Sequence, residues 1–190
     1  FQKKENTLIF TFCGTFFTKL TPEDLFISLK KINVQNIKIK IRFIGNFRRN
    51  IWELKNKFEK QFSQNISIQL IPRMGYRQLI NELYKSDILM LFVEDNDMLH
   101  AKIFDYLVTK KAILAFCPKE SDTENIIKKG NLGFTIENGN IVQGVETIEN
   151  IIQLFKENKL SKIHGNDDYI KQFTRKNLTK KFAKILDNLL

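Results

Sequence analysis

The stretch Ile88-Leu-Met-Leu-Phe-Val93 is apolar at every position and has no polar face. A strand with this pattern is buried on both sides, which is typical of a central strand in a parallel sheet that helices cover. The loop Glu94–His100 leads from it into a predicted helix over Ala101–Thr109, and a second apolar strand follows over Ala112–Phe116. The stretch therefore predicts a strand-helix-strand unit at the centre of an α/β sheet.

The same alternation continues toward both ends of the chain. Further strands are predicted over residues 7–16, 37–45, 66–71 and 133–136. Further helices are predicted from Pro22 to about Asn33, from Asn50 through Phe58, over 76–85, from Ser121, over 145–157 and within the tail 167–190. Short connections between alternating elements predict a doubly wound, Rossmann-like fold, in which a mostly parallel six-stranded sheet carries helices on both faces. We expect one domain over residues 1–190, with a C-terminal helix in 167–190.

Composition limits the classes of function. The net charge of +10 favours an anionic partner, such as a nucleotide phosphate, a lipid phosphate or a nucleic acid. Cys13 and Cys117 lie in apolar runs without zinc spacing, and we expect both to be buried, reduced thiols. The histidines His100 and His164 have no metal-ligand spacing, so we expect no metal. No leader or membrane-spanning run is visible in the sequence, so we expect a soluble, excised, cytoplasmic domain.

A ligand crevice is expected beyond the carboxyl ends of the first and fourth strands. With the common strand order 3-2-1-4-5-6, the chain reverses direction between these strands and their loops diverge. The first loop, Gly14–Leu20, offers backbone amides and Lys19 to an anion. The second, Glu94–Ala101, offers carboxylates, and Asp105 lies on the helix that follows it. Neither G-x-G-x-x-G after the first strand nor a G-x-x-x-x-G-K-[ST] loop occurs, which disfavours NAD enzymes and P-loop NTPases.

Five segments in order along the chain resemble the C-terminal, donor-binding domain of the family 4 retaining glycosyltransferases, which have the GT-B fold. The segments are FCGTF (12–16), RFIGNFR (42–48), LYKSDILMLFV (83–93), AKIFDYLVTKKAILAF (101–116) and the basic terminal helix. The fourth is the most specific, because such enzymes carry two glutamates separated by seven residues, the second in a K-[LI]-F-E-Y-L helix start. Asp97 and Asp105 stand at this spacing.

The resemblance implies roles for these acids. Asp105 would hold the ribose hydroxyls of the donor nucleotide, since a carboxylate accepts two hydrogen bonds from a vicinal diol. Asp97 would contact the donor sugar near the reacting carbon, with Glu94 as its substitute if the loop shifts in register. The alternative for Asp105 is a first-turn acid that complements the helix dipole, and for Asp97 a solvated loop acid or N-cap.

The resemblance also implies where the diphosphate and the nucleobase bind. Thr15 stands where the family has an arginine, and Lys19 lies near the position of a second cation; Lys102 is a further candidate. The loop from Arg73 to Tyr76 resembles the segment that brackets the nucleobase. The alternatives are a plain turn at Gly14, solvated cations and packing of Tyr76. The candidate donor-binding residues are thus Gly14, Thr15, Lys19, Arg73, Tyr76, Lys102 and Asp105, and the candidate catalytic residues are Asp97 and Glu94.

The implied function is a hexosyltransferase of polysaccharide biosynthesis that transfers a sugar from UDP or GDP to an acceptor hydroxyl with retention. It would need no cofactor, would take a glycan or lipid-linked acceptor through a missing N-terminal domain, and could associate peripherally with the inner face of the membrane. We expect the isolated domain to be inactive. The first rival interpretation is a degenerate, non-catalytic nucleotide-binding or interaction module. The second is a basic nucleic-acid-binding domain, although no nucleic-acid partner is implied.

Overall fold

The described residues form a six-stranded parallel sheet in the order β3-β2-β1-β4-β5-β6. The computed structural model describes residues 6–16, 21–34, 36–62, 64–96 and 101–188. The strands are β1 (Thr7–Cys13), β2 (Lys38–Gly45), β3 (Ile66–Pro72), β4 (Ile88–Phe92), β5 (Ala112–Cys117) and β6 (Gly133–Glu137). The predicted strands and their order 3-2-1-4-5-6 are confirmed.

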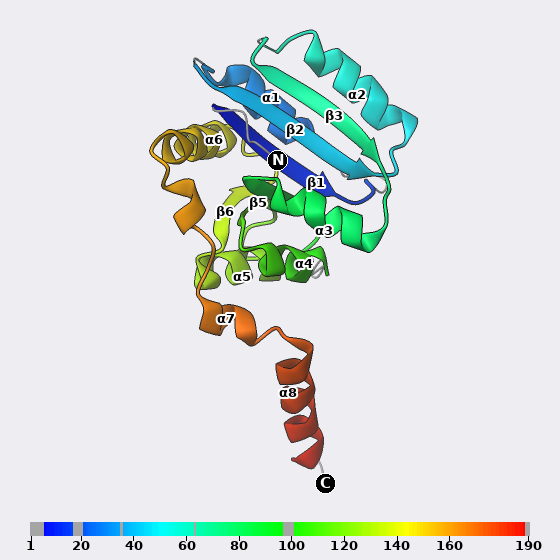
Figure 1. The fold of residues 1–190 in the computed structure, drawn as a ribbon, viewed down its shortest axis with the longest axis vertical. Coiled ribbons are helices and arrows are strands. Elements are labelled where there is room, and N and C mark those ends of the chain that lie inside the picture. The colour runs from blue at the N-terminus through cyan, green and yellow to red at the C-terminus, as the bar shows by residue number, and fades with distance from the viewer. Residues whose placement is uncertain (1–5, 17–20, 35, 63, 97–100, 189–190) are drawn as a thin grey trace.

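Helices cover both faces of this sheet (Figure 1). Three of them, α1 (Glu23–Lys31), α2 (Arg49–Glu59) and α6 (Ile141–Lys156), bury their apolar residues on one face. On the other face lie α3 (Tyr76–Tyr84), α4 (Lys102–Thr109) and α5 (Asp122–Gly130). The doubly wound, Rossmann-like architecture is therefore confirmed. Among the described segments, no helix has the length and apolar character needed to cross a bilayer.

Strand β4 shows why its sequence has no polar face. Ile88, Met90 and Phe92 pack into the apolar cluster beneath α1 and α6, while Leu89 and Leu91 pack into the cluster beneath α4 and α5. Successive side chains of a strand point to opposite faces, so a strand between two helical layers must be apolar at both sets of positions. The strand therefore lies at the centre of the domain.

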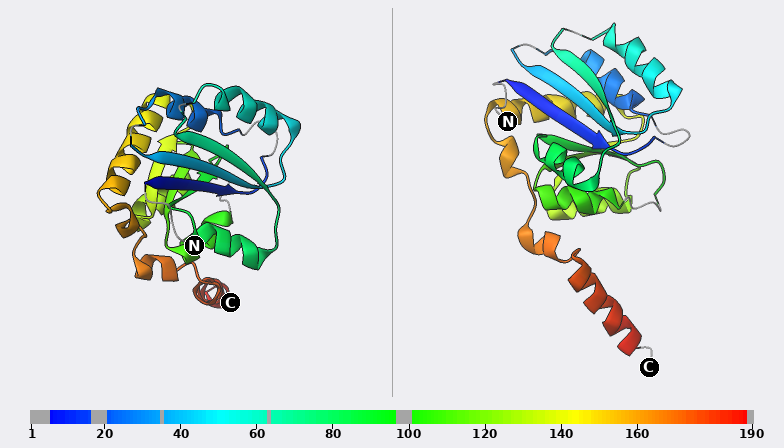
Figure 2. Two further views of the ribbon diagram at one scale, coloured as in Figure 1. Left: turned by 45° about the horizontal axis from the view of Figure 1, so that its top comes forward. Right: turned by 45° about the vertical axis from the view of Figure 1, so that its right-hand side comes forward.

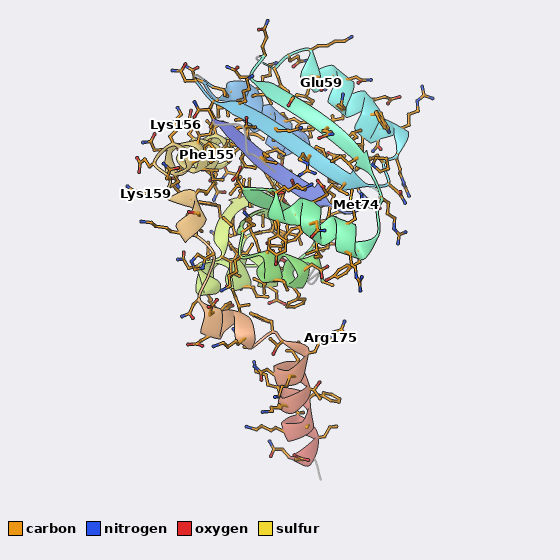
Figure 3. The ribbon with its side chains drawn as sticks, viewed as in Figure 1. Glu59, Met74, Phe155, Lys156, Lys159 and Arg175 are labelled. Carbon is orange, nitrogen blue, oxygen red and sulfur yellow. The ribbon has the colours of Figure 1, made fainter. Side chains whose placement is uncertain are left out.

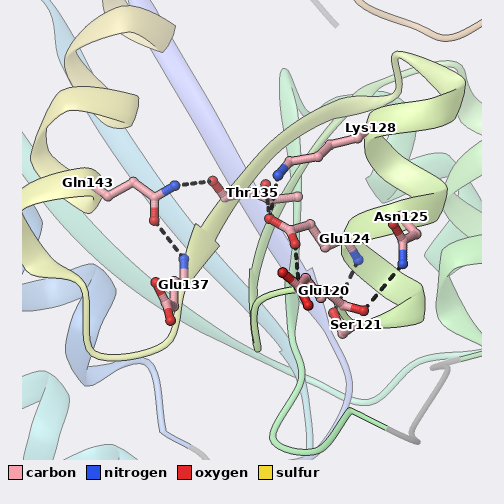
Figure 4. Close-up of polar contacts among 8 residues, drawn as sticks. All are labelled: Glu120, Ser121, Glu124, Asn125, Lys128, Thr135, Glu137 and Gln143. Atoms are coloured by element: carbon pink, nitrogen blue, oxygen red, sulfur yellow. Dashed lines mark hydrogen bonds and ion pairs between the residues drawn. The ribbon is translucent and has the colours of Figure 1, made fainter.

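Side-chain caps determine where two of the helices begin. Ser121 Oγ accepts a hydrogen bond from Glu124 N (3.3 Å), as in a capping box, and the helix begins where the sequence predicts. The carboxylate of Glu124 accepts from the amide of Glu120 (2.6 Å), one residue earlier than in the standard box (Figure 4). Helix α6 begins at Ile141, earlier than predicted, because Asn140 Oδ1 accepts from Gln143 N (3.1 Å).

The tail contains two helices, a short α7 (Asp167–Lys171) and a longer α8 (Arg175–Asp187). The chain breaks between them at Thr174, whose hydroxyl caps α8 by accepting from Asn177 N (3.4 Å). Just before this break the ring of Phe173 packs against Phe104 of α4, with centroids 5.6 Å apart. Helix α8 then projects away from the sheet and its covering helices, as Figure 2 shows.

Candidate functional site

A cavity of about 330 Å³ opens at the carboxyl ends of β1, β2 and β3, beside the first turns of α3 and α4. Its lining includes the loop after β1 and the helix α4 that follows β4. The strand order reverses between these two strands, and they pair only at Phe10 and Thr11 of β1. This is the reversal point of a doubly wound sheet, where ligands bind in such folds. Six of the predicted donor-binding residues line this cavity: Gly14, Thr15, Arg73, Tyr76, Lys102 and Asp105.

Tyr106 bridges β1 and β4 where they separate. Its hydroxyl accepts a hydrogen bond from the amide of Cys13 (3.1 Å) and donates one to the carbonyl of Met90 (3.1 Å). Both backbone groups would otherwise lack a partner in a buried place, where an unpaired polar group is costly. Burial raises the pKa of Tyr106 well above 10, so the phenol keeps the proton that it donates. Tyr106 thereby holds the end of β1 and the start of α4 in a fixed relation.

Gly14 begins the loop after β1 and has a backbone conformation that favours glycine. Its amide donates to the carbonyl of Ile44 (2.8 Å), and its backbone lies at φ +148°, which L residues with a side chain rarely adopt. A side chain there would also displace the end of the Lys102 side chain, and one at Gly45 would collide with the backbone carbonyl of Gly14. These two glycines therefore let the ends of β1 and β2 approach one another and leave space for Lys102.

Lys102 brings a cation into this cavity. Its ammonium nitrogen lies 5.1 Å from the centroid of the Phe12 ring, and burial lowers the pKa of the group. Within the described part of the chain Lys102 forms no ion pair. Lys102 is the first residue of α4, and Ala101 before it has no side chain that could cap the helix. A half-buried cation beside a helix N-terminus favours an anionic ligand.

Asp105 lies one turn after Lys102 on α4 and also lines the cavity. Tyr76, at the start of α3, donates a hydrogen bond from its hydroxyl to Asp105 Oδ1 (3.3 Å). The negative charge of Asp105 raises the pKa of the exposed Tyr76 phenol, which keeps this donor protonated. A carboxylate has about four acceptor positions, so Asp105 can bind a ligand hydroxyl pair while it holds Tyr76.

The structure does not bring Glu94 into this cavity. Glu94 lines a separate cavity of about 250 Å³ at the ends of β4 and β5, together with Asp24 and Asn138. Asp24 is already used there as an acceptor for the amide of Gly139 (2.7 Å). The predicted residues Lys19 and Asp97, like His100, lie outside the described residues.

Both thiols are in protected positions, as the sequence predicts. Cys13 and Cys117 are buried and free, and burial raises both thiol pKa values, to about 11 for Cys117. A thiol with a raised pKa is a poor nucleophile near neutral pH. No cluster of three or more metal-ligating side chains occurs in the part of the chain that the structure describes.

Sequence reasoning gave three residues of the site no role of their own. Tyr106, Asn46 and Met74 all lie in segments that the resemblance singles out, and Asn46 and Met74 line the cavity. Figure 3 labels Met74 in the connection between β3 and α3. Asn46 follows Gly45 at the end of a central strand, and a polar residue after a strand-ending glycine was the signal that could have identified it.

Comparison with solved structures gives matches among glycosyltransferases. HepE of Anabaena, solved in complex with UDP-glucose, matches with a TM-score of 0.73 at 12% identity, over 96% of this chain and 49% of that chain. The lipopolysaccharide outer core galactosyltransferase WaaB in its apo form matches with a TM-score of 0.69 at 16% identity, over 99% and 51%. A glycosyltransferase from Rickettsia africae matches with a TM-score of 0.66 at 15% identity, over 95% and 47%.

These matches concern the fold. No protein-family profile matches the sequence, and no curated protein matches it. The chain spans about half the length of the solved structures that it matches. At identities this low, the likeness confirms the glycosyltransferase-like fold that the five segments predict. The chain therefore has the fold of about one half of these glycosyltransferases.

Proposed function

We propose that the chain binds a nucleoside diphosphate sugar as the donor half of a retaining glycosyltransferase. The observation that carries the proposal is that Asp105, Lys102 and Gly14 line one cavity at the reversal point of the sheet. A carboxylate suited to a diol and a cation suited to phosphate lie on successive turns of α4, as a ribose diphosphate requires. The UDP-glucose bound to HepE supports this ligand class.

In this proposal each group of the cavity binds one part of the donor. Asp105 accepts hydrogen bonds from the ribose hydroxyls, while Tyr76 and Arg73 flank the base. Lys102, the amide of Thr15 and the N-terminus of α4 bind the diphosphate, and Gly14 lets them approach it closely. The sugar then extends toward the loop 94–101, where Asp97 would contact it near the reacting carbon. Catalysis would consist mainly of positioning the donor and stabilising the leaving diphosphate.

The acceptor would be a glycan or lipid-linked hydroxyl, held by an N-terminal domain that forms the other wall of the cleft. This chain alone is therefore expected to bind UDP or GDP weakly and to transfer nothing. Metal ions are not expected to contribute, because Lys102 and backbone amides would neutralise the phosphates.

Calorimetric titration with UDP and with GDP tests the proposal. Asp105→Ala should weaken binding of the preferred nucleotide roughly tenfold or more, because it removes charge-assisted hydrogen bonds to the ribose. Asp122→Ala is the matched control, since Asp122 is also a first-turn acid, on the neighbouring helix α5. It should change affinity by less than about twofold. Equal affinities of the two variants would show that Asp105 acts only as a helix-dipole acid.

A second candidate is a nucleotide-binding module that has lost transfer, and Thr15 favours it because the resemblance places an arginine there. Thr15→Arg distinguishes a weakened donor site from an unrelated cavity. If a diphosphate binds beside Gly14, the new guanidinium should tighten UDP binding by roughly fivefold or more and leave uridine binding unchanged. An equal gain for UDP and uridine, or no gain, would mean that no diphosphate lies beside this loop.

A further inference from the structure

The tail of the chain packs against the helix that carries Asp105. The ring of Phe173 lies against those of Phe104 on α4 and Tyr169 on α7, with centroids 5.6 and 5.3 Å apart. Phe104 directly precedes Asp105, which lines the cavity. Contacts between large aromatic rings hold a segment in place, because they bury much apolar area at preferred distances. The chain just after Phe173 is therefore fixed close to the part of α4 that lines the cavity.

Arg175 follows this anchor as the first residue of α8. Thr174 precedes it, and the hydroxyl of Thr174 accepts a hydrogen bond from the amide of Asn177 (3.4 Å), which fixes where the helix begins. Figure 3 labels Arg175 at the end of α8 that adjoins the domain. The side chain is exposed and forms no ion pair with the described residues. Its guanidinium group is therefore available to a ligand.

The charge of Arg175 reaches Tyr76, which lines the cavity from the start of α3. The negative charge of Asp105 raises the pKa of the Tyr76 phenol, and the positive charge of Arg175 acts on it in the opposite direction. Water and salt screen exposed charges, so an effect of this kind requires that the two groups lie close together. An aromatic ring, a carboxylate and a guanidinium from three separate helices thus meet at this end of the cavity.

From this arrangement we propose that Arg175 is a further donor-binding residue, which contacts the nucleobase beside Tyr76. The inference rests on the proposed donor binding, in which Tyr76 and Arg73 flank the base. A guanidinium is planar and stacks on aromatic faces, and every nucleobase offers such a face. The diphosphate is a less suitable partner, because Lys102, which would bind it, lies one turn earlier on α4 than Asp105, the acid that Tyr76 contacts. The contact lies within this chain, so it does not require the rest of α8 to be free of a partner.

Calorimetric titration of the full chain tests the proposal, with the preferred nucleotide, UDP or GDP, and with its nucleoside. Arg175→Gln should weaken binding of both ligands by the same factor, roughly fivefold, because both carry the base. Arg175→Lys should lose about as much, since an ammonium group keeps the charge but lacks the planar surface. Lys176→Gln removes a charge at the next position of α8 and should change affinity by less than about twofold. Both side chains are exposed, so the variants should fold, and circular dichroism checks this.

Three other results would overturn the proposal. A loss for the nucleotide but not for the nucleoside would place Arg175 at the diphosphate. Full affinity in Arg175→Lys, or an equal loss in Lys176→Gln, would mean that charge alone attracts the ligand. Tighter binding by Arg175→Gln would mean that the guanidinium competes with the ribose for Asp105.

Asp105→Ala separates a failure of this proposal from a failure of donor binding itself. If Asp105→Ala weakens nucleotide binding and Arg175→Gln does not, the donor site remains and Arg175 lies outside it. If the unmodified chain binds neither nucleotide, or if Asp105→Ala binds as tightly as the unmodified chain, the base has no assigned place beside Tyr76 and both proposals fail.

Discussion

Helices α4 and α5 follow neighbouring strands and begin at the same edge of the sheet, but their first turns differ. In α5, Ser121 and Glu124 bind free backbone amides of the helix start with their own side chains. In α4, Ala101 provides no side-chain cap, and Lys102 at the first position turns toward the cavity. Capping stabilises a helix, whereas a half-buried cation that forms no ion pair with the described residues remains available to a ligand. The comparison teaches that the start of α5 is closed by its own side chains, whereas the start of α4, here called the open helix end, brings a cation to a cavity.

The largest effect that follows from this comparison is expected at Lys102. Lys102→Met keeps the length of the side chain but removes the cation beside Gly14 and the α4 N-terminus. UDP affinity should fall by roughly 10- to 100-fold, the value of a charge-assisted hydrogen bond to phosphate. Isothermal titration measures this, with Lys129→Met on α5 as the control. If both variants bind UDP as the unmodified chain does, α4 is not the open helix end that the comparison describes.

A smaller effect is expected where Tyr106 ties α4 to β1 and β4. Tyr106→Phe fills the same space but leaves Cys13 N–H and the Met90 carbonyl without their partner. Unfolding in urea should show a loss of about 1–3 kcal/mol. UDP affinity, measured where the variant is fully folded, should also fall, because Gly14 and Lys102 lose their fixed relation.

Tyr84→Phe is the matched control for that prediction. The hydroxyl of Tyr84 also donates to a backbone carbonyl, that of Val108, but at the exposed surface (3.4 Å). Its removal should change stability by less than about 0.5 kcal/mol and leave UDP affinity unaltered. Loss of stability without loss of affinity in Tyr106→Phe would limit Tyr106 to a structural role.

The next effect is expected at the start of α5, where the side chain of Ser121 caps the helix. Ser121→Ala removes the cap of α5 and should lower the free energy of unfolding by about 1 kcal/mol. Nucleotide affinity should not change, because Ser121 is not among the described residues that line the cavity. Urea denaturation and the same titration measure the two quantities. A drop in UDP affinity would show that the two helix starts are not independent.

The fold could be predicted from the sequence because the relevant signals are local. An apolar run such as residues 88–93 can be buried on both sides only between two helical layers. The pair Ser121 and Glu124 is a local sequence signal for the start of a helix. Two helix boundaries differ from the prediction. Helix α6 begins earlier because Asn140 caps it, and Thr174 caps a separate helix inside the tail, where one longer helix was expected.

The residues of the candidate site could be predicted only where they belong to a recognisable sequence motif. Asp105 and Lys102 belong to one short helix segment whose spacing indicates their common face. The bridge made by Tyr106 depends on how far β1 and β4 diverge, and no local pattern encodes that divergence. Glu94, expected only as a substitute for Asp97 near the sugar, lines the neighbouring cavity at the ends of β4 and β5, and its contact with a sugar stays a prediction.

The smallest expected effect concerns the stability of the folded chain, which the half-buried cation of Lys102 lowers. Burial lowers the pKa of Lys102 below its ordinary value of 10.5, so the charged form is less favourable in the folded state than in the unfolded chain. The unfolded state then binds more protons between the folded-state pKa and 10.5, and this group makes stability rise with pH across that window.

Lys102→Met should therefore be more stable than the unmodified chain at neutral pH, and the difference should shrink as the pH approaches 10.5. Thermal unfolding of both proteins over a pH series measures it, and saturating UDP should cancel the difference by supplying the missing anion. A difference that does not vary with pH would mean that packing of the methionine, rather than release of an unpaired cation, stabilises the variant.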